Sequence, residues 1–317
     1  MPYVSERSPL DQHFLKQLKL LVAQDLIFYG SHLVWIYLAW AIWRWRKARQ
    51  SGMLAWRLAL AALFCWMRFA EPQWIVERET TLAPATGTRI ALISDTHLGA
   101  YKGAAFAGRL AQQINALHPD CVLIAGDFLY APDRPLAELF AGFNALHGRV
   151  YAVLGNHDSH ELGWLHGGDV ERKAISAALA QAGVELIEDR VVDCGKVKVA
   201  GIGDRWSGKE DFRAALAYRG AQPLVLVTHN PDTAYSVPKS LTRLLLAGHT
   251  HGGQIRLPLV YPYVIPVKGP FDRGLLGAVQ WSEDPAGRPD VFVTSGVGEI
   301  GLPMRLLNPP AIDLLNL

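Results

Sequence analysis

Several short apolar runs of this sequence end in side chains that could bind a metal ion. Each run is rich in Val, Ile, Leu or Ala and stops at an Asp, an Asn or a His. The residues concerned are, in chain order, Asp95, His97, Asp127, Asn156, His157, His229, His249 and His251. Any one of them alone could be a helix cap, a turn residue or a surface histidine. Five runs with the same kind of ending are hard to obtain by chance, so the set predicts one shared site.

The donor types indicate which ions such a site would hold. Carboxylate, imidazole and amide oxygen suit divalent transition metals such as manganese, iron, zinc or cobalt. The three cysteines, Cys65, Cys121 and Cys194, match no zinc spacing, which argues against a structural zinc site. Cys121 lies in the apolar run CVLIAGD, where we expect a packed core thiol. One carboxylate can bridge two ions about 4 Å apart, and such a pair activates a phosphoryl group for in-line displacement.

The elements that must position these residues alternate along the chain. The apolar runs read as short strands, and Ala104–Leu117 and Pro135–Leu146 between them look helical. Alternating strands and helices predict an α/β fold with an at least partly parallel sheet. Functional residues of such sheets collect at the carboxyl ends of the strands. We therefore expect the eight residues along one edge of one sheet.

The sequence GNHDSH at residues 155–160 has two interpretations when taken alone. Gly-Asn is common turn chemistry, so the segment could be a turn with a solvated histidine. Following a buried strand and accompanied by the other four endings, it instead indicates that Asn156 and His157 belong to the site. We expect His160 to be a loop histidine. The flanking segments 159–169 and 258–274, rich in Gly, Pro and aromatic residues, are expected to form pocket walls.

The first eighty residues differ from the rest and have the features of a membrane segment. Leu26–Trp43 has 18 residues without a formal charge. As a helix it would be about 27 Å long, close to the thickness of a bilayer core. A second stretch, Met53–Ala70, carries Arg57 and Arg68 and could span the bilayer or lie flat among the headgroups. Tryptophans crowd both stretches, as in an interfacial belt; a pair of buried soluble helices is the alternative.

The basic segment Arg44–Arg49 between the two stretches bears on orientation. Short loops rich in Lys and Arg stay on the cytoplasmic side. If both stretches span, the C-terminal part lies outside the cytoplasm; if one spans, or the pair lies on one surface, that part can be cytoplasmic. The net charge is only +2, and no nucleic-acid partner is expected. Residues 71–87 lose apolar periodicity, so we expect a helical hairpin and linker at residues 1–80 and a second domain at residues 81–317.

Read in order, the motifs DTH, GD, GNHD, THN and GHTHGGQ resemble those of the calcineurin-like metallophosphoesterases. The resemblance covers roughly residues 88–317. The segments GIGDRWSG, THNPD and GHTHGGQIRLPLV are similar to the YaeI/YkuE-type bacterial phosphodiesterase branch. A member of that branch in chlamydiae cleaves the UDP-2,3-diacylglucosamine of lipid A synthesis and also has a membrane-associated N-terminus.

The resemblance implies a fold and a set of residue roles. The fold is a four-layer αββα sandwich with a dinuclear metal site at its top, here preceded by the hydrophobic helical hairpin. The first metal ion would be bound by Asp95, His97 and His251. The second would be bound by Asn156, His229 and His249, with Asp127 bridging the two. His157 would donate a proton or stabilise the transition state, and Asp158 would orient it.

The resemblance and the hairpin together predict a membrane-associated phosphodiesterase or pyrophosphatase. We expect it to use two divalent ions, first of all manganese, with iron, zinc or cobalt as alternatives. The expected substrate is a phosphoester of a lipid or a nucleotide-linked lipid such as UDP-2,3-diacylglucosamine, and the expected location is the bacterial inner membrane. A phosphoprotein or small-molecule phosphatase, and a non-catalytic metal-binding scaffold, are the alternatives. An acid at His157 favours an enzyme over a scaffold.

Overall fold

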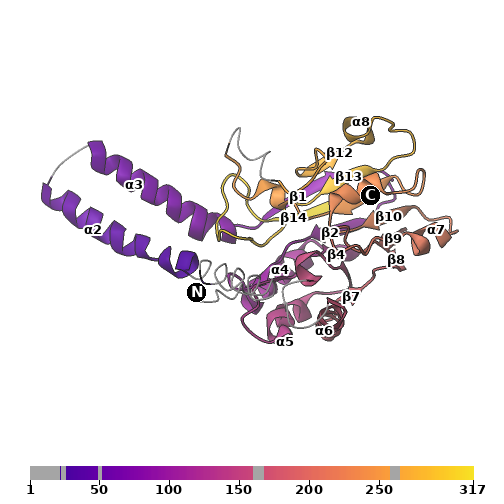
Figure 1. Cartoon of the computed structure of the whole chain (residues 1–317), viewed down its shortest axis with the longest axis horizontal. Coiled ribbons are helices and arrows are strands. Elements are labelled where there is room, and N and C mark those ends of the chain that lie inside the picture. The colour runs from indigo at the N-terminus through magenta and orange to yellow at the C-terminus, as the bar shows by residue number, and fades with distance from the viewer. Residues whose placement is uncertain (1–21, 23–25, 49–51, 160–167, 258–264) are drawn as a thin grey trace, which may run out of the picture.

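The protein consists of a layered α/β body from which a helical hairpin projects (Figure 1). The computed structural model describes residues 22, 26–48, 52–159, 168–257 and 265–317. Two six-stranded sheets form the body. The hairpin extends from one side of the body, and its two helices run antiparallel to each other (Figure 1). The expected order of a helical hairpin followed by an α/β domain is confirmed.

The first sheet has the strand order β1-β14-β2-β4-β6-β7. Strands β2, β4, β6 and β7 are parallel, and β14 is antiparallel to β2 but parallel to β1. The strand bounds are β1 Val76–Thr81, β2 Arg89–Ile93, β4 Cys121–Ala125, β6 Arg149–Val153, β7 Glu185–Leu186 and β14 Ala311–Asn316. Two further short strands, β3 Leu98–Gly99 and β5 Leu129–Tyr130, pair with each other beside the ligand loops.

The second sheet has the order β12-β13-β11-β10-β9-β8. Its four central strands are parallel, and the two edge strands are antiparallel to their neighbours. The strand bounds are β8 Val191–Cys194, β9 Val197–Gly201, β10 Leu224–Val227, β11 Leu244–Ala247, β12 Gly274–Leu276 and β13 Asp290–Val293.

Three apolar cores hold four layers together. In β2, Ile90 and Leu92 pack toward the second sheet, whereas Ala91 and Ile93 pack toward helices, as the two-residue period of a strand requires. The helices outside the first sheet are α4 Ala104–Ala116, α5 Leu136–Phe140, the 3-10 helix η3 Ala141–Ala145, and α6 Gly168–Gln181. Those outside the second are α7 Arg213–Ala217, the 3-10 helix η5 Pro231–Tyr235, and α8 Ala278–Trp281. The predicted αββα sandwich is confirmed.

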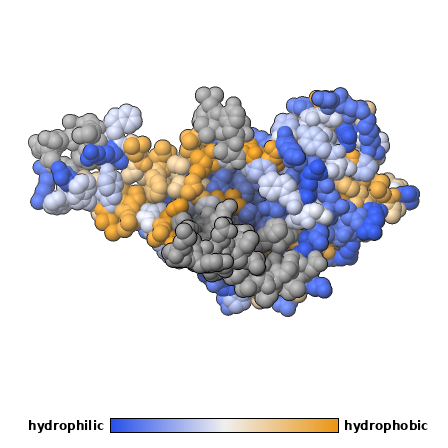
Figure 2. All heavy atoms as spheres, in the orientation of Figure 1, coloured by the Kyte–Doolittle hydropathy of each residue, from blue (hydrophilic) through white to orange (hydrophobic). Residues whose placement is uncertain are grey.

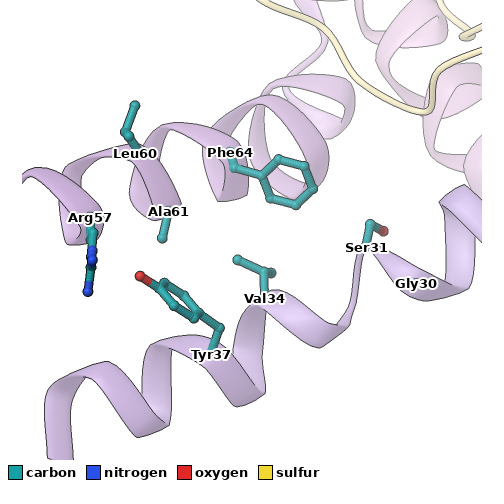
Figure 3. Close-up of a pocket in the computed structure, with 8 residues that line it drawn as sticks. All are labelled: Gly30, Ser31, Val34, Tyr37, Arg57, Leu60, Ala61 and Phe64. Carbon is teal, nitrogen blue, oxygen red and sulfur yellow. The ribbon is translucent and has the colours of Figure 1, made fainter. Parts of the chain in front are cut away.

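The hairpin is built from α2 Leu33–Ala48 and α3 Gly52–Cys65. Helix α3 continues into the π-helix η1 Trp66–Ala70 and the 3-10 helix η2 Glu71–Gln73. Side chains of Val34, Tyr37, Ala61 and Phe64 line a cavity of about 410 Å³ between the two helices (Figure 3). Within the described residues, one segment, Leu26–Arg44, is long and apolar enough to cross a membrane, and only 6% of it is buried.

The junction between hairpin and sandwich lies close to the predicted boundary. Strand β1, which begins at Val76, pairs with β14 along its whole length and so belongs to the first sheet. The division at residues 80 and 81 stays a prediction, but a shortened protein that keeps the sheet intact has to begin before Val76.

A disulfide joins the two sheets. It links Cys121 of β4 to Cys194 of β8 across 73 residues, and both cysteines are buried in the core between the sheets. The expectation of a free core thiol at Cys121 is therefore wrong. The burial was foreseen, but the partner comes from a strand whose position opposite β4 no local pattern reveals.

Candidate metal centre

The expected ligands meet at one end of the sandwich, but they come from both sheets. Asp95 and His97 follow β2, Asp127 follows β4, and Asn156 follows β6 in the first sheet. His229 follows β10, and His249 and His251 follow β11, in the second. The expectation of one edge of one sheet is therefore wrong, because the two sheets stack with these strand ends on the same side. Each sheet contributes part of the site.

The backbone at the site is strained in a consistent way. The residues with a φ in the left-handed region include Asp95, His97, Asp127, His249 and His251, with values from 43° to 72°. A side chain in this region costs about 1–3 kcal/mol, and such residues cluster at functional sites. The chain leaves each strand and turns sharply, so the side chain points to the centre of the site. At Gly155 an added Cβ would collide with the carboxylate of Asp127, which explains glycine there.

Asp95, His97 and His251 form the first candidate ligand group. The Nε2 atoms of His97 and His251 are 3.1 Å apart, and His251 Nε2 is 3.3 Å from Asp95 Oδ1. All three side chains are buried. Two imidazole nitrogens facing each other beside a carboxylate oxygen repel unless a proton or a cation lies between them. The geometry therefore suits a cation.

Asp127, His229 and His249 form the second group. Asp127 Oδ2 lies 3.1 Å from His229 Nε2, and His229 Nε2 lies 3.1 Å from His249 Nδ1. The same Oδ2 atom is 3.7 Å from His97 Nε2 of the first group. Asp127 thus lies between the two groups, where a bridging carboxylate would have to be.

Backbone carbonyl groups fix which nitrogen of each ring faces inward. The outward nitrogen of His97 contacts the carbonyl of Leu129 at 3.1 Å. That of His229 contacts Ala125 at 2.7 Å, and that of His249 contacts Pro266 at 3.2 Å. A carbonyl only accepts, so each outward nitrogen carries the proton and each inward nitrogen is the one that can coordinate a metal. These carbonyl partners could not be predicted from residue types.

Unpartnered buried atoms test whether the residues present fit metal ions. Among the described residues, Asp95 Oδ1 and Asn156 Oδ1 are buried oxygen atoms without a hydrogen-bond partner. A buried oxygen atom without a partner is costly, and a metal ion is one of the few groups that would satisfy it. The residues therefore fit two divalent cations, and Asn156, which lines the same pocket, offers an oxygen atom that a cation would satisfy.

Burial and neighbouring charges together shift the pKa values of the site residues. Burial lowers the pKa of His249 to about 3, and lowers that of His251 well below its usual value. Both rings are thus neutral at pH 7, the form that binds metals. Burial also raises the pKa of Asp95 to about 6. For Asp127 burial acts in the same direction, but the neighbouring His229 and His157 lower its pKa well below the usual value.

His157 and Asp158 lie on a 3-10 turn, η4 His157–Ser159, beside the second group. The backbone N–H of His157 donates to Asp127 Oδ1 at 3.0 Å, and its side chain lines the pocket above the metal groups. The carboxylate of Asp158 accepts hydrogen bonds from the backbone of Phe128, Leu129 and Gly155. These bonds hold the ligand loops together, and the role of Asp158 in orienting the His157 ring stays a prediction.

The metal groups open into a pocket of about 520 Å³ that is lined by both polar and apolar residues. The polar residues include Asp127, Asn156, His157, His249 and His251. The apolar residues are Trp206, Ile255, Leu257, Pro266, Ile300 and Leu302.

Only part of the expected pocket wall was found. Pro266 lies in the predicted segment 258–274 and lines the pocket, whereas residues 160–167, with His160, and residues 258–264 are outside the described part. Trp206, in the quoted motif GIGDRWSG, was not predicted, nor were Ile300 and Leu302. Trp206 packs on His249 with ring centroids 4.5 Å apart.

Comparison with known proteins identifies the family. Residues 88–253, just over half of the chain, match the model for calcineurin-like phosphoesterases. The chain is 27% identical over 290 residues to the metallophosphoesterase YkuE of Bacillus subtilis, which covers 86% of this chain and 95% of YkuE. It is 25% identical over 276 residues to the phosphodiesterase YaeI of Escherichia coli, which covers 82% of this chain and 94% of YaeI.

A third relative is larger. A transmembrane protein with a metallophosphoesterase domain from Danio rerio is 26% identical over 283 residues. The match covers 81% of this chain and 60% of the fish protein.

Proposed function

This chain belongs to the calcineurin-like phosphoesterase family, and we propose that it hydrolyses a phosphodiester or pyrophosphate bond of a lipid substrate at a membrane surface. The family resemblance read from the motifs is confirmed, and the chain is a metal-dependent phosphoester hydrolase with two groups of candidate metal ligands. The lipid substrate, the membrane and manganese as the preferred ion are our proposals.

The residue roles in this proposal follow the geometry of the site. Asp95, His97 and His251 would hold one cation, Asn156, His229 and His249 the other, and Asp127 both. When bound, such a pair supplies Lewis-acid activation of the phosphoryl group and of a water nucleophile.

The protein supplies the remaining proton transfer. As water forms the new bond to phosphorus, the bond to the leaving oxygen breaks, and His157 would donate a proton to that oxygen. Its place on the pocket wall, with its backbone tied to Asp127, supports this role.

The lipid proposal rests on the apolar residues that line the pocket. Leu257 and Leu302 are 47% and 42% exposed, although they lie beside a highly polar site. Tyr101 packs on Phe28 of the helical segment that precedes α2, and its hydroxyl donates to the carbonyl of Gly301. The exposed Leu302 therefore lies next to the base of the hairpin. An alkyl chain leaving a bilayer around the hairpin would meet this wall first.

A pair of matched diesters tests the proposal. Methyl p-nitrophenyl phosphate and dodecyl p-nitrophenyl phosphate share the bond that breaks and differ only in the alkyl chain. With manganese present, we expect kcat/KM to be at least about tenfold higher for the dodecyl ester, because burying even two methylene groups contributes about 1.6 kcal/mol. Leu302→Ser should reduce this preference about fivefold and leave the methyl ester unaffected.

The outcomes separate the parts of the proposal. Leu216→Ser on α7 is the matched control, because Leu216 is 45% exposed and lies outside the pocket. Equal rates for both esters would exclude the lipid substrate but leave the phosphodiesterase standing. If only phosphopeptides were hydrolysed, the phosphoprotein phosphatase alternative would hold, and metal binding without turnover of any phosphoester would favour a scaffold.

A further inference from the structure

Buried polar side chains connect the base of the hairpin to the metal-binding loops. Glu71, Lys102, Glu299, Arg305 and Asn308 are at most 4% exposed, and four of the five carry an ionisable group. Buried charges are costly unless they are paired and hydrogen-bonded. None of these residues belongs to a ligand motif, so the network has a purpose that the motifs do not explain.

The shortest connection runs from Glu71 through Asn308 to His251. Glu71, in η2, accepts a hydrogen bond from Trp66 Nε1 at 2.7 Å and another from the backbone N–H of Asn308 at 2.6 Å. The side-chain amide of Asn308 donates to the carbonyl of His251 at 2.5 Å. Two hydrogen bonds thus join the end of the hairpin to the backbone of a candidate metal ligand.

Asn308 holds the backbone of His251 and Gly252, which has an unusual conformation. His251 has a φ of 50° and Gly252 a φ of 54°, both in the left-handed region. An added Cβ at Gly252 would lie 3.0 Å from the Asn308 amide, so the two segments are already in close contact. A strained backbone persists only where its surroundings fix it. Asn308 is such a surrounding group, and the direction of the His251 ring depends on that backbone.

A second connection runs from the π-helix to Asp95. The backbone N–H of Arg305 donates to the carbonyl of Met67 in η1 at 2.9 Å. The guanidinium of Arg305 donates to the carbonyl of Gly298 at 2.6 Å, and the N–H of Gly298 donates to the carbonyl of Asp95, also at 2.6 Å. The hairpin base therefore contacts the loops of two members of the first ligand group.

We propose that Glu71 and Asn308 are positioning residues that fix His251 for metal binding and make the metal site depend on the docked base of the hairpin. The inference rests on the proposed role of His251 as a ligand. It goes beyond that role because Glu71 touches no candidate ligand and acts only through Asn308. Groups that orient metal ligands typically change metal affinity by about 10- to 100-fold when they are lost.

Manganese affinity of the full-length protein in detergent, measured by competition with a chelator, tests this inference. Asn308→Asp keeps the shape of the side chain but removes the donor to His251. We expect it to weaken binding of the first-group manganese about 10- to 100-fold, as for a lost outer ligand partner. Glu71→Gln should weaken it less, and the double variant should bind like Asn308→Asp alone, because the two residues act in series.

Asn316 and Glu79 provide the matched control. The Asn316 side chain donates a hydrogen bond to Glu79 at 2.8 Å, between β14 and β1. The two residues are 237 positions apart, as Glu71 and Asn308 are, but their hydrogen bond is exposed. Asn316→Asp and Glu79→Gln should leave manganese affinity unchanged. Folded Asn308→Asp protein with unchanged affinity would overturn the inference, as would additive effects in the double variant. If Asn308→Asp does not fold, the manganese affinity of Glu71→Gln tests the inference in its place. Wild-type protein that binds no manganese would instead refute the proposed metal site itself.

Discussion

The hairpin and the sandwich use similar apolar residues in opposite ways. In the sandwich the Val, Ile and Leu side chains of the central strands are almost fully buried. In the hairpin Trp56 is 74% exposed, Ile36 68% and Leu60 63%. In Figure 2 the hairpin carries a hydrophobic band with hydrophilic residues at its far end, whereas the sandwich surface is mostly hydrophilic.

The two regions lack different kinds of partner. The sandwich buries its apolar residues internally, and the atoms without a partner there are polar and include the oxygen atoms of Asp95 and Asn156 at the site. In the hairpin it is the apolar residues that lack a partner, since an exposed apolar band of this size needs a nonaqueous partner. The first region fits metal ions, and the second fits the bilayer that we propose as its surroundings. Variants in the two regions should affect hydrolysis of a soluble diester very differently.

The largest effect is expected at Asp127, the residue between the two ligand groups. Asp127→Asn should reduce hydrolysis of bis-p-nitrophenyl phosphate by about 10³-fold or more, because metal ions contribute several kcal/mol to the stabilisation of the transition state. Elemental analysis should show loss of both ions. Asp284→Asn, at an exposed carboxylate paired with Lys239, is the control. A variant that keeps its metal and its activity would contradict the bridging role.

A smaller effect is expected at His157, which lines the pocket but belongs to neither ligand group. His157→Asn should keep its metal and lose about 10²-fold in rate, the usual scale for a general acid. His147→Asn, at an exposed histidine, should change neither. Collapse of the metal content in His157→Asn would show that His157 is a ligand instead.

The site residues at the strand ends could be predicted because each belongs to a pattern of neighbouring residues in the sequence. A run of apolar residues followed by Asp, Asn or His can be read within six or seven residues, and the order of the motifs identified the family. Such a pattern also predicted Asn156 as a site residue despite its neutral side chain, and Asn156 lines the pocket.

Features formed by distant residues were not predictable in this way. The disulfide between Cys121 and Cys194, the split of the site between two sheets, and the contact of Glu71 with Asn308 all depend on which strands and loops become neighbours. Hydrogen bonds to backbone carbonyls, such as that of His229 to Ala125, leave no trace in residue types. Arg305, fully buried, would have been read as a surface residue on composition alone.

The smallest effect on hydrolysis is expected from substitutions at the far end of the hairpin, whose basic residues we expect to determine the orientation in the membrane. Arg44, Arg46 and Lys47 lie at the end of α2, away from the sandwich, and short basic loops stay in the cytoplasm. The segment 52–70 returns alongside α2 and is about 28 Å long, close to the thickness of a bilayer core, although Leu26–Arg44 is the one described segment that is also apolar enough to cross by composition. The disulfide between Cys121 and Cys194 is typical of compartments outside the cytoplasm. These observations together predict two spans with the sandwich outside.

Protease added to spheroplasts tests this orientation. The sandwich should be cleaved in intact spheroplasts, and detergent but not high salt should release the protein, since salt screens charges without expelling an apolar helix. Neutralising the basic end by Arg44→Gln, Arg46→Gln and Lys47→Gln should protect part of the protein by reversing its orientation, while Arg213→Gln on α7 should not. In detergent, the triple variant should hydrolyse the soluble diester within about twofold of the wild-type rate, as expected for substitutions on the surface. Complete protection of the wild-type sandwich would mean one span and a cytoplasmic site. With the basic end in the cytoplasm, only a second crossing would carry residues 76–317 to the outer side.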